Sequence, residues 1–259
     1  MSQRRRYKNP PIDEVFCRVD FPPILKISNE SPADFQEKLR TDYPLYSPEI
    51  GQEIIAGPFG AGIQQPLNIS STALNVHSFR KYEDKGVVTI AANYFLFSTK
   101  KYTDWNDFKK AFFDVFDAFK EIYRPQIFTR VGLAYRDVFV RSRYDLGDKK
   151  WTDLINNEFL GPLSKDYVDC ETTYSSVCDL GFNDSKERAR INVAIVVNND
   201  NKPLEEKERC LFIENDVFIM DRIPPTDARG VLDNLHEFAS KLFKAIPTEI
   251  LEKAMEPIE

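Results

Sequence analysis

The chain has 259 residues, of which 42% are hydrophobic and 13% aromatic, so it can bury a sizeable core as one large domain or two small ones. Its net charge of −6, from 35 lysines and arginines against 41 aspartates and glutamates, argues against broad non-specific attraction to nucleic acid or anionic lipid. No apolar run reaches the roughly 18 residues that cross a membrane, and we expect a cytoplasmic protein.

The chain opens with a basic segment. Residues 1–9 contain three consecutive arginines and predict a disordered arm, which is either a solvated tail or a contact for nucleic acid. A strand is expected over 14–21, which is rich in β-branched and aromatic residues and ends at a pair of prolines. A short helix is expected over 31–39, and the prolines and glycines between 43 and 66 predict a long irregular loop.

The first half ends with two strands and a long helix. The strands are expected over 74–81 and 87–97, and the residues between them suit a hairpin loop. Between Asp104 and Tyr123, apolar residues recur at steps of three and four, which predicts a helix with one apolar face. Asp104 can serve as its N-cap, and Pro125 cannot continue it.

The second half repeats this order in outline, and the apolar positions of the two long helices coincide when the helices are aligned. Internal duplication explains this agreement, but any two amphipathic helices can be aligned in the same way, so both explanations stay open. The elements expected there are strands over 128–140, 167–180, 189–197 and 209–220, a short helix over 152–159 and a long helix over 226–246.

These elements predict an α+β fold with two similar halves, residues 10–125 and 126–259, which pack as one unit. Each half is expected to form its own curved antiparallel sheet, covered on one face by its long helix.

No catalytic signature is found in the sequence. The glycine-rich segment 57–62 lacks the lysine and hydroxyl residue of a P-loop and the strand-to-helix context of a dinucleotide-binding loop. His236-Glu237 begins like a zinc-protease helix, but Ser240 occupies the place of the second histidine. His77 is the only other histidine and is expected to be solvated or partly covered. We therefore predict no metal, no cofactor and no catalytic residue.

His236 and Glu237 nevertheless remain binding candidates, because they are the only plausible acid–base neighbours for a pocket under the 43–66 loop. The alternative is a histidine at the boundary of the apolar helix face, with its hydrogen bonds satisfied.

Arg130 and Arg136 are the other binding candidates, and they belong to a local cluster of positive charge around a strand of the second half. Asp137 and Asp145 are their expected partners, and ordinary surface ion pairs would account for the cluster.

Three segments together resemble a sporadically distributed bacterial family of uncharacterised proteins of about this length. They are Asn9 to Phe16, Arg130 to Asp137, and Leu232 to Glu237 with Phe243 after it. The resemblance implies a single unit over nearly the whole chain and brings no known activity. The patchy distribution of that family would suit an accessory gene in a phage-defence or toxin-linked locus.

The leading functional hypothesis from the sequence is a non-enzymatic scaffold that binds another protein, because paired catalytic groups are lacking. Two alternatives stay open. One is nucleic-acid binding through the basic arm and a concave sheet, and the other is an enzyme or small-ligand pocket under the 43–66 loop.

Overall fold

One antiparallel sheet of nine strands forms the centre of an α+β fold, in the order β3-β4-β5-β6-β2-β7-β10-β9-β8. The computed structural model describes residues 6–51, 74–82, 85–169, 174–197 and 207–258. The strands of this sheet are β2 Ile12–Asp20, β3 Leu45–Gly51, β4 Leu74–Arg80, β5 Gly86–Ala91, β6 Tyr94–Thr99, β7 Arg130–Phe139, β8 Ser175–Gly181, β9 Glu187–Val197 and β10 Arg209–Ile219.

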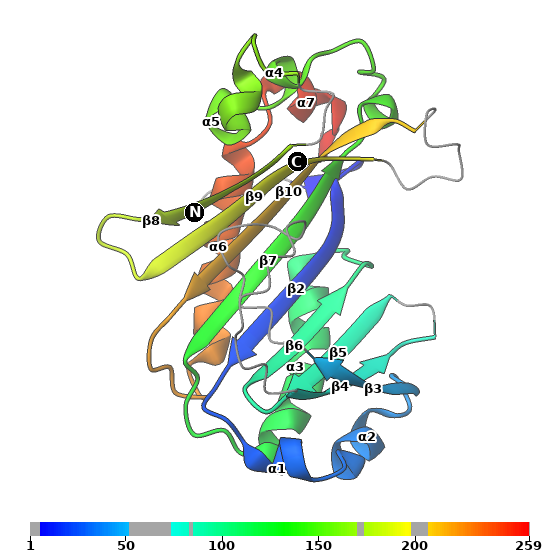
Figure 1. Ribbon diagram of the computed structural model, residues 1–259, viewed down its shortest axis with the longest axis vertical. Helices are drawn as coiled ribbons and strands as arrows, with labels where there is room; N and C mark the ends of the chain where they lie inside the picture. Colours follow the sequence, from blue (N-terminus) through cyan, green and yellow to red (C-terminus); the bar gives the residue numbers. More distant parts are fainter. Residues whose placement is uncertain (1–5, 52–73, 83–84, 170–173, 198–206, 259) are drawn as a thin grey trace.

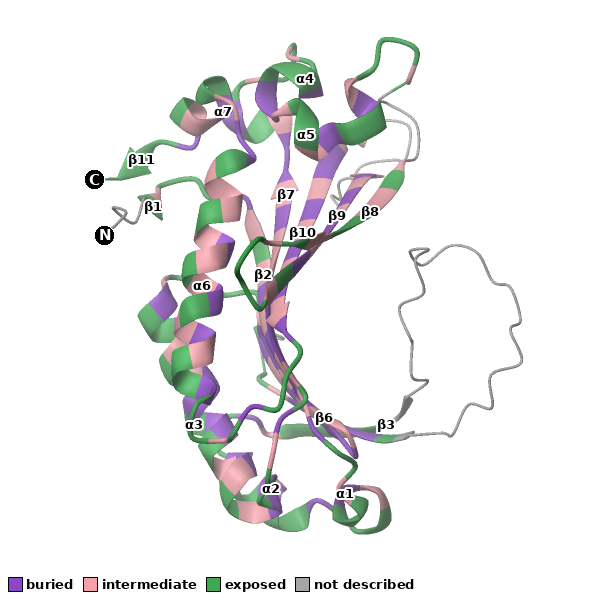
Figure 2. Ribbon diagram, turned by 90° about the vertical axis from the view of Figure 1, so that its left-hand side faces the viewer, coloured by how far each residue is buried: buried purple, intermediate pink, exposed green. Residues whose placement is uncertain are grey.

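The two long helices, α3 Trp105–Tyr123 and α6 Ala228–Ala245, lie on one face of this sheet (Figure 1). The sheet curves away from them, so that its opposite face is concave (Figure 2). The shorter helical elements are α1 Leu25–Asn29, α2 Ala33–Leu39, η1 Arg141–Tyr144, α4 Trp151–Leu154, α5 Asn157–Leu160, η2 Gly161–Ser164 and α7 Glu249–Ala254.

The pairing of β2 with β7 joins the two halves. These strands are antiparallel, with Val15 opposite Tyr135 and Val19 opposite Val131, and the register shifts between Ile12 and Glu14. The expectation of two separate sheets was wrong. A separate sheet would leave the backbone N–H and C=O groups of β2 or β7 without partners at a buried edge, and the pairing of these two strands satisfies them.

The strands follow a similar order on the two sides of this junction. In the first half the order outward from the junction is β2-β6-β5-β4-β3, and in the second half it is β7-β10-β9-β8. In each half, the strand that comes first in the chain therefore pairs with the strand that comes last. The later strands of each half form a meander, in which each strand pairs with the next one along the chain.

Helix α3 begins and ends where its sequence predicts. The Asp104 side chain accepts a hydrogen bond of 3.0 Å from the backbone N–H of Asp107, so it serves as the N-cap. Arg124 adopts a left-handed conformation with φ of 47° directly after the helix, and Pro125 follows. The predicted helix over 104–123 is confirmed.

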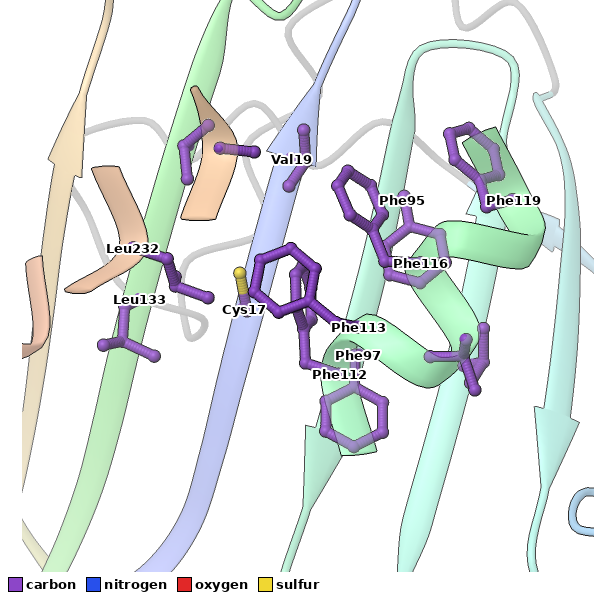
Figure 3. Close-up of a cluster of buried hydrophobic side chains, with 14 of the residues drawn as sticks. Cys17, Val19, Phe95, Phe97, Phe112, Phe113, Phe116, Phe119, Leu133 and Leu232 are labelled. Atoms are coloured by element: carbon purple, nitrogen blue, oxygen red, sulfur yellow. The ribbon is translucent and has the colours of Figure 1, made fainter. Parts of the chain in front are cut away.

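The main core lies between α3 and the sheet, and it consists largely of phenylalanine rings (Figure 3). Phe116 stacks on Phe112 and on Phe119, with ring centroids 4.9 Å and 5.9 Å apart, and Phe95 of β6 packs against all three. Leu232 of α6 reaches the same cluster. Burial of each of these side chains stabilises the fold by about 1.5–3 kcal/mol, so the apolar helix face seen in the sequence is the main source of stability.

Four elements differ from their predictions. The strand expected over 87–97 is a hairpin of β5 and β6 that turns at Ala92 and Asn93. Residues 45–51 form the edge strand β3, although a loop was expected over 43–66 and its remainder from residue 52 lies outside the described residues.

The helix expected over 152–159 is two short helices separated at Ile155 and Asn156. The strand expected over 167–180 begins only at Ser175. In each case a short apolar run fits more than one local structure, and tertiary contacts select among them.

The chain ends pair with each other. Arg6–Tyr7 forms β1, and it pairs with β11, Pro257–Ile258, beside α6 on the helix-covered side of the sheet (Figure 2). Of the disordered arm expected over 1–9, residues 1–5 lie outside the described residues, and the backbone of residues 6–9 pairs with the C-terminal segment. Among the described residues, no helix has both the length and the apolar character needed to cross a membrane.

Candidate functional site

A cavity of about 340 Å³ lies on the helix-covered side of the sheet, where the halves meet. Strands β7 and β10 form its floor, and α6 and the start of α3 form its walls. The paired chain ends β1 and β11 contribute Arg6, Tyr7 and Ile258 to the lining. We call this cavity the junction pocket.

Two buried polar side chains stand on the floor of the junction pocket. Asp137 of β7 is 1% exposed and Asn215 of β10 is 2% exposed. Alternate side chains of a strand share a face, so Asp137 and Asn215 each stand on the core-facing side of their strand. Neither carboxylate oxygen of Asp137 has a hydrogen-bond partner among the described residues, and the same holds for Oδ1 of Asn215.

Burial raises the pKa of Asp137 to about 8. The cause is the loss of water around the carboxyl group, which disfavours its charged form, and no neighbouring cation opposes this effect. Buried carboxyl groups without a partner are rare in stable proteins and are common in binding and catalytic sites. Asp137 is therefore the residue that makes the junction pocket the candidate site of this structure.

A hydrogen-bonded histidine forms one wall of the pocket. Tyr135 of β7 lies two residues before Asp137, and its hydroxyl is 2.8 Å from Nδ1 of His236 on α6. Burial raises the pKa of the Tyr135 phenol well above its ordinary value, so the phenol keeps its proton. The tautomer of His236 decides which of the two groups donates in this hydrogen bond.

Trp105 holds His236 from the other side. The indole and imidazole rings stack with their centroids 4.2 Å apart and their planes 5° from parallel. The indole Nε1 donates to Oδ1 of Asp233 at 2.8 Å, and Nζ of Lys109 donates to the same oxygen at 2.8 Å. The first turn of α3 is thereby tied to α6, and the position of His236 is fixed by groups of both halves.

An ion pair lies at the pocket beside the chain ends. The Arg6 guanidinium donates to a carboxylate oxygen of Asp104 at 3.1 Å. Backbone hydrogen bonds from Asp107 and Asn106, and the charge of Arg6, hold the pKa of Asp104 below its ordinary value. The charge of Arg6 is therefore matched by Asp104, and Asp137 is the remaining carboxyl group in the described lining.

The four candidates from the sequence do not form one site. His236 lines the junction pocket, whereas Glu237 is exposed and does not line it. Of the 43–66 segment, under which a pocket was expected, no described residue lines the junction pocket, and residues 52–66 lie outside the described part of the chain. His77, for which a solvated or partly covered position was expected, is 8% exposed, and Tyr46 hydrogen-bonds its Nδ1 at 3.1 Å.

Arg130 and Arg136 lie on the concave face, on the other side of the sheet from Asp137. Arg130 donates to both oxygens of Asp216, at 2.9 Å and 2.7 Å. Arg136 donates to Glu214 at 2.6 Å and to Glu14 at 2.7 Å. The expectation that Asp137 pairs with these arginines was wrong, because successive side chains of a strand point to opposite faces.

The ion pairs of Arg130 and Arg136 would oppose nucleic-acid binding at the concave face. The two arginines there are matched by three carboxylates, and their guanidinium groups also lie over aromatic rings, at 4.7 Å from Phe218 and 4.6 Å from Phe16. A phosphate would have to displace these partners before it could contact either arginine.

The residues missed by the sequence analysis are Asp137, Asn215, Tyr135 and Trp105. One signal could have found two of them, since Asp137 and Asn215 interrupt the apolar alternation of otherwise core-facing strand positions. The partnership of Trp105 with His236 had no local signal, because 130 intervening residues separate them in the chain. The described residues hold no group of three or more His, Cys, Asp or Glu side chains that could bind a metal ion.

No protein-family model matches the chain, and no curated protein matches it either. The family resemblance given by the three sequence segments therefore stays a prediction.

Proposed function

We propose that the protein binds a small molecule in the junction pocket. The observation that carries this proposal is Asp137, a buried carboxyl group on the pocket floor with both oxygens unpaired among the described residues. Leaving a buried polar group without a hydrogen bond costs about 1–3 kcal/mol, and more for a charged group. A ligand with donor groups would remove that cost.

The surroundings of Asp137 support a binding role. The cavity volume of about 340 Å³ lies at the lower end of the range for small-molecule sites, and its lining combines aromatic side chains with a few polar groups. His236 is held between Trp105 and Tyr135 by stacking and a hydrogen bond, so the wall is rigid before a ligand arrives.

Binding of another protein, the hypothesis that led from the sequence, stays a prediction. We prefer the small-molecule proposal because Asp137 gives it a specific buried acceptor on the floor of a cavity, whereas no comparable feature of the described surface indicates a protein partner.

We also propose that the two halves arose by internal duplication. The support is the similar strand order on both sides of the β2–β7 junction, with one long helix after the last sheet strand of each half. The junction pocket would then lie at the interface between the two repeats.

The proposal is tested by screening a fragment library of neutral, acidic and basic compounds with ligand-observed NMR. Ser240 of α6 lines the pocket, so Ser240→Phe should fill the cavity and abolish binding of the fragments that bind the wild type. The adjacent Lys241 is exposed, and Lys241→Phe serves as the matched control that leaves binding unchanged. Failure of every fragment to bind, or binding that persists in Ser240→Phe, would refute the proposal.

A further inference from the structure

The chemical class of the ligand can be inferred from the pocket, and this inference rests on the proposed function. We propose that the junction pocket takes a planar cation with two adjacent N–H donors, an amidinium or guanidinium group, and that Asp137 accepts both donors.

The unpaired polar atoms of the floor are oxygens, and all of them accept hydrogen bonds when Asp137 is ionised. Both oxygens of Asp137 and Oδ1 of Asn215 lack a partner among the described residues. Asn215 lies directly opposite Tyr135 on the neighbouring strand, and Asp137 is the next residue on the same face of β7. A carboxylate with two unpaired oxygens matches two parallel N–H donors on one planar edge, which is the geometry of amidinium and guanidinium groups.

The charge of the pocket points to a monocation. Among the charged side chains of the described lining, Arg6 is paired with Asp104, which leaves the carboxyl group of Asp137 unmatched. A neutral ligand would leave Asp137 protonated, so that one of its oxygens would carry a donor instead of accepting, and an anion would be repelled by the ionised form. A single positive charge compensates the ionised Asp137. The carboxyl group, which burial otherwise keeps protonated, then releases its proton when the cation binds.

The walls are largely aromatic. Trp105 and His236 stack face to face on each other, and Tyr102 packs edge-on against Tyr135 with centroids 5.8 Å apart. Planar cations are stabilised by such aromatic surroundings, and this effect grows when the site is shielded from water. The volume of about 340 Å³ accommodates the cationic group together with an attached ring or short chain.

Three compounds of nearly the same shape and different charge test this inference. They are benzamidine, which is cationic, benzamide, which is neutral, and benzoate, which is anionic. We expect saturation-transfer NMR and calorimetry to detect benzamidine binding at least about 30-fold tighter than binding of the other two, a ratio that corresponds to roughly 2 kcal/mol for a buried charge pair.

The variant Asp137→Asn keeps the shape of the side chain and removes its charge, so it should weaken benzamidine binding by about the same factor. Asp216→Asn is the matched control. Asp216 is also an aspartate on a central strand, but it is paired with Arg130 on the opposite face, so its replacement should leave benzamidine affinity unchanged.

Two results would overturn the inference. Tighter or equal binding of benzamide or benzoate in the pocket would show that its ligand is not a cation, although the proposed small-molecule function would stand. Benzamidine binding that survives Asp137→Asn would show that Asp137 is not the acceptor. Should that variant fail to fold, Ser240→Phe gives the second test, since benzamidine that still binds to the filled pocket also refutes the site.

Discussion

Replacing Asp137 by asparagine tests whether the carboxyl group on the pocket floor is held without a partner. In the unfolded chain an aspartate has a pKa of about 3.9. In the folded protein, burial raises the pKa of Asp137 to about 8. Between these two values the folded state binds a proton that the unfolded state has lost, so Asp137 makes the protein less stable as the pH rises.

The magnitude follows from the two pKa values. Stability falls by about 1.4 kcal/mol per pH unit within this window, and the slope levels off near the folded pKa. Between pH 5 and pH 8 the loss due to Asp137 amounts to about 3.6 kcal/mol. Asparagine does not ionise, so the stability of Asp137→Asn relative to the wild type should be about 3.6 kcal/mol higher at pH 8 than at pH 5.

Urea denaturation of both proteins at the two pH values measures this difference, and the comparison cancels the titration of all other groups. Asp233→Asn is the control. Burial raises the pKa of Asp233, but the hydrogen bonds from Lys109 and Trp105 outweigh this and hold it below its ordinary value. Asp233 is therefore ionised in both states across this range, and its replacement should have the same effect at both pH values. An equal effect of Asp137→Asn at the two pH values would refute the reasoning.

Two further predictions concern the sheet. A Cβ atom at Gly132 would lie 2.4 Å from the Arg130 guanidinium, so Gly132→Ala should displace this ion-paired group and lower the unfolding free energy by about 1–3 kcal/mol, whereas Gly147→Ala, with open space around it, should change little. Cys17 is fully buried, which raises its thiol pKa, and Cys178 is exposed. Iodoacetamide should therefore label Cys178 in the native protein and Cys17 only after unfolding, as mass spectrometry can verify, and labelling of native Cys17 would contradict the fold.

The sequence by itself determined the elements whose stability is local or follows from one apolar face. Helix α3 was predicted to within a residue, because its N-cap, its apolar stripe and the following proline act within about one or two helical turns. The strands that became β2, β4, β7, β9 and β10 were likewise visible as alternating or β-branched runs.

Only the tertiary structure decided how these elements share their edges and faces. The β2–β7 pairing brings together residues more than one hundred positions apart, and hydrogen bonding between strand edges carries no local sequence signal. The tertiary structure also set the surroundings of Asp137. As one residue in a cluster of arginines it looked like a surface partner, but in the folded sheet it faces the helices and points away from Arg136. Burial without a neighbouring cation then raises its pKa, because the energy of a charged group depends on what surrounds it in space rather than on its neighbours in the chain.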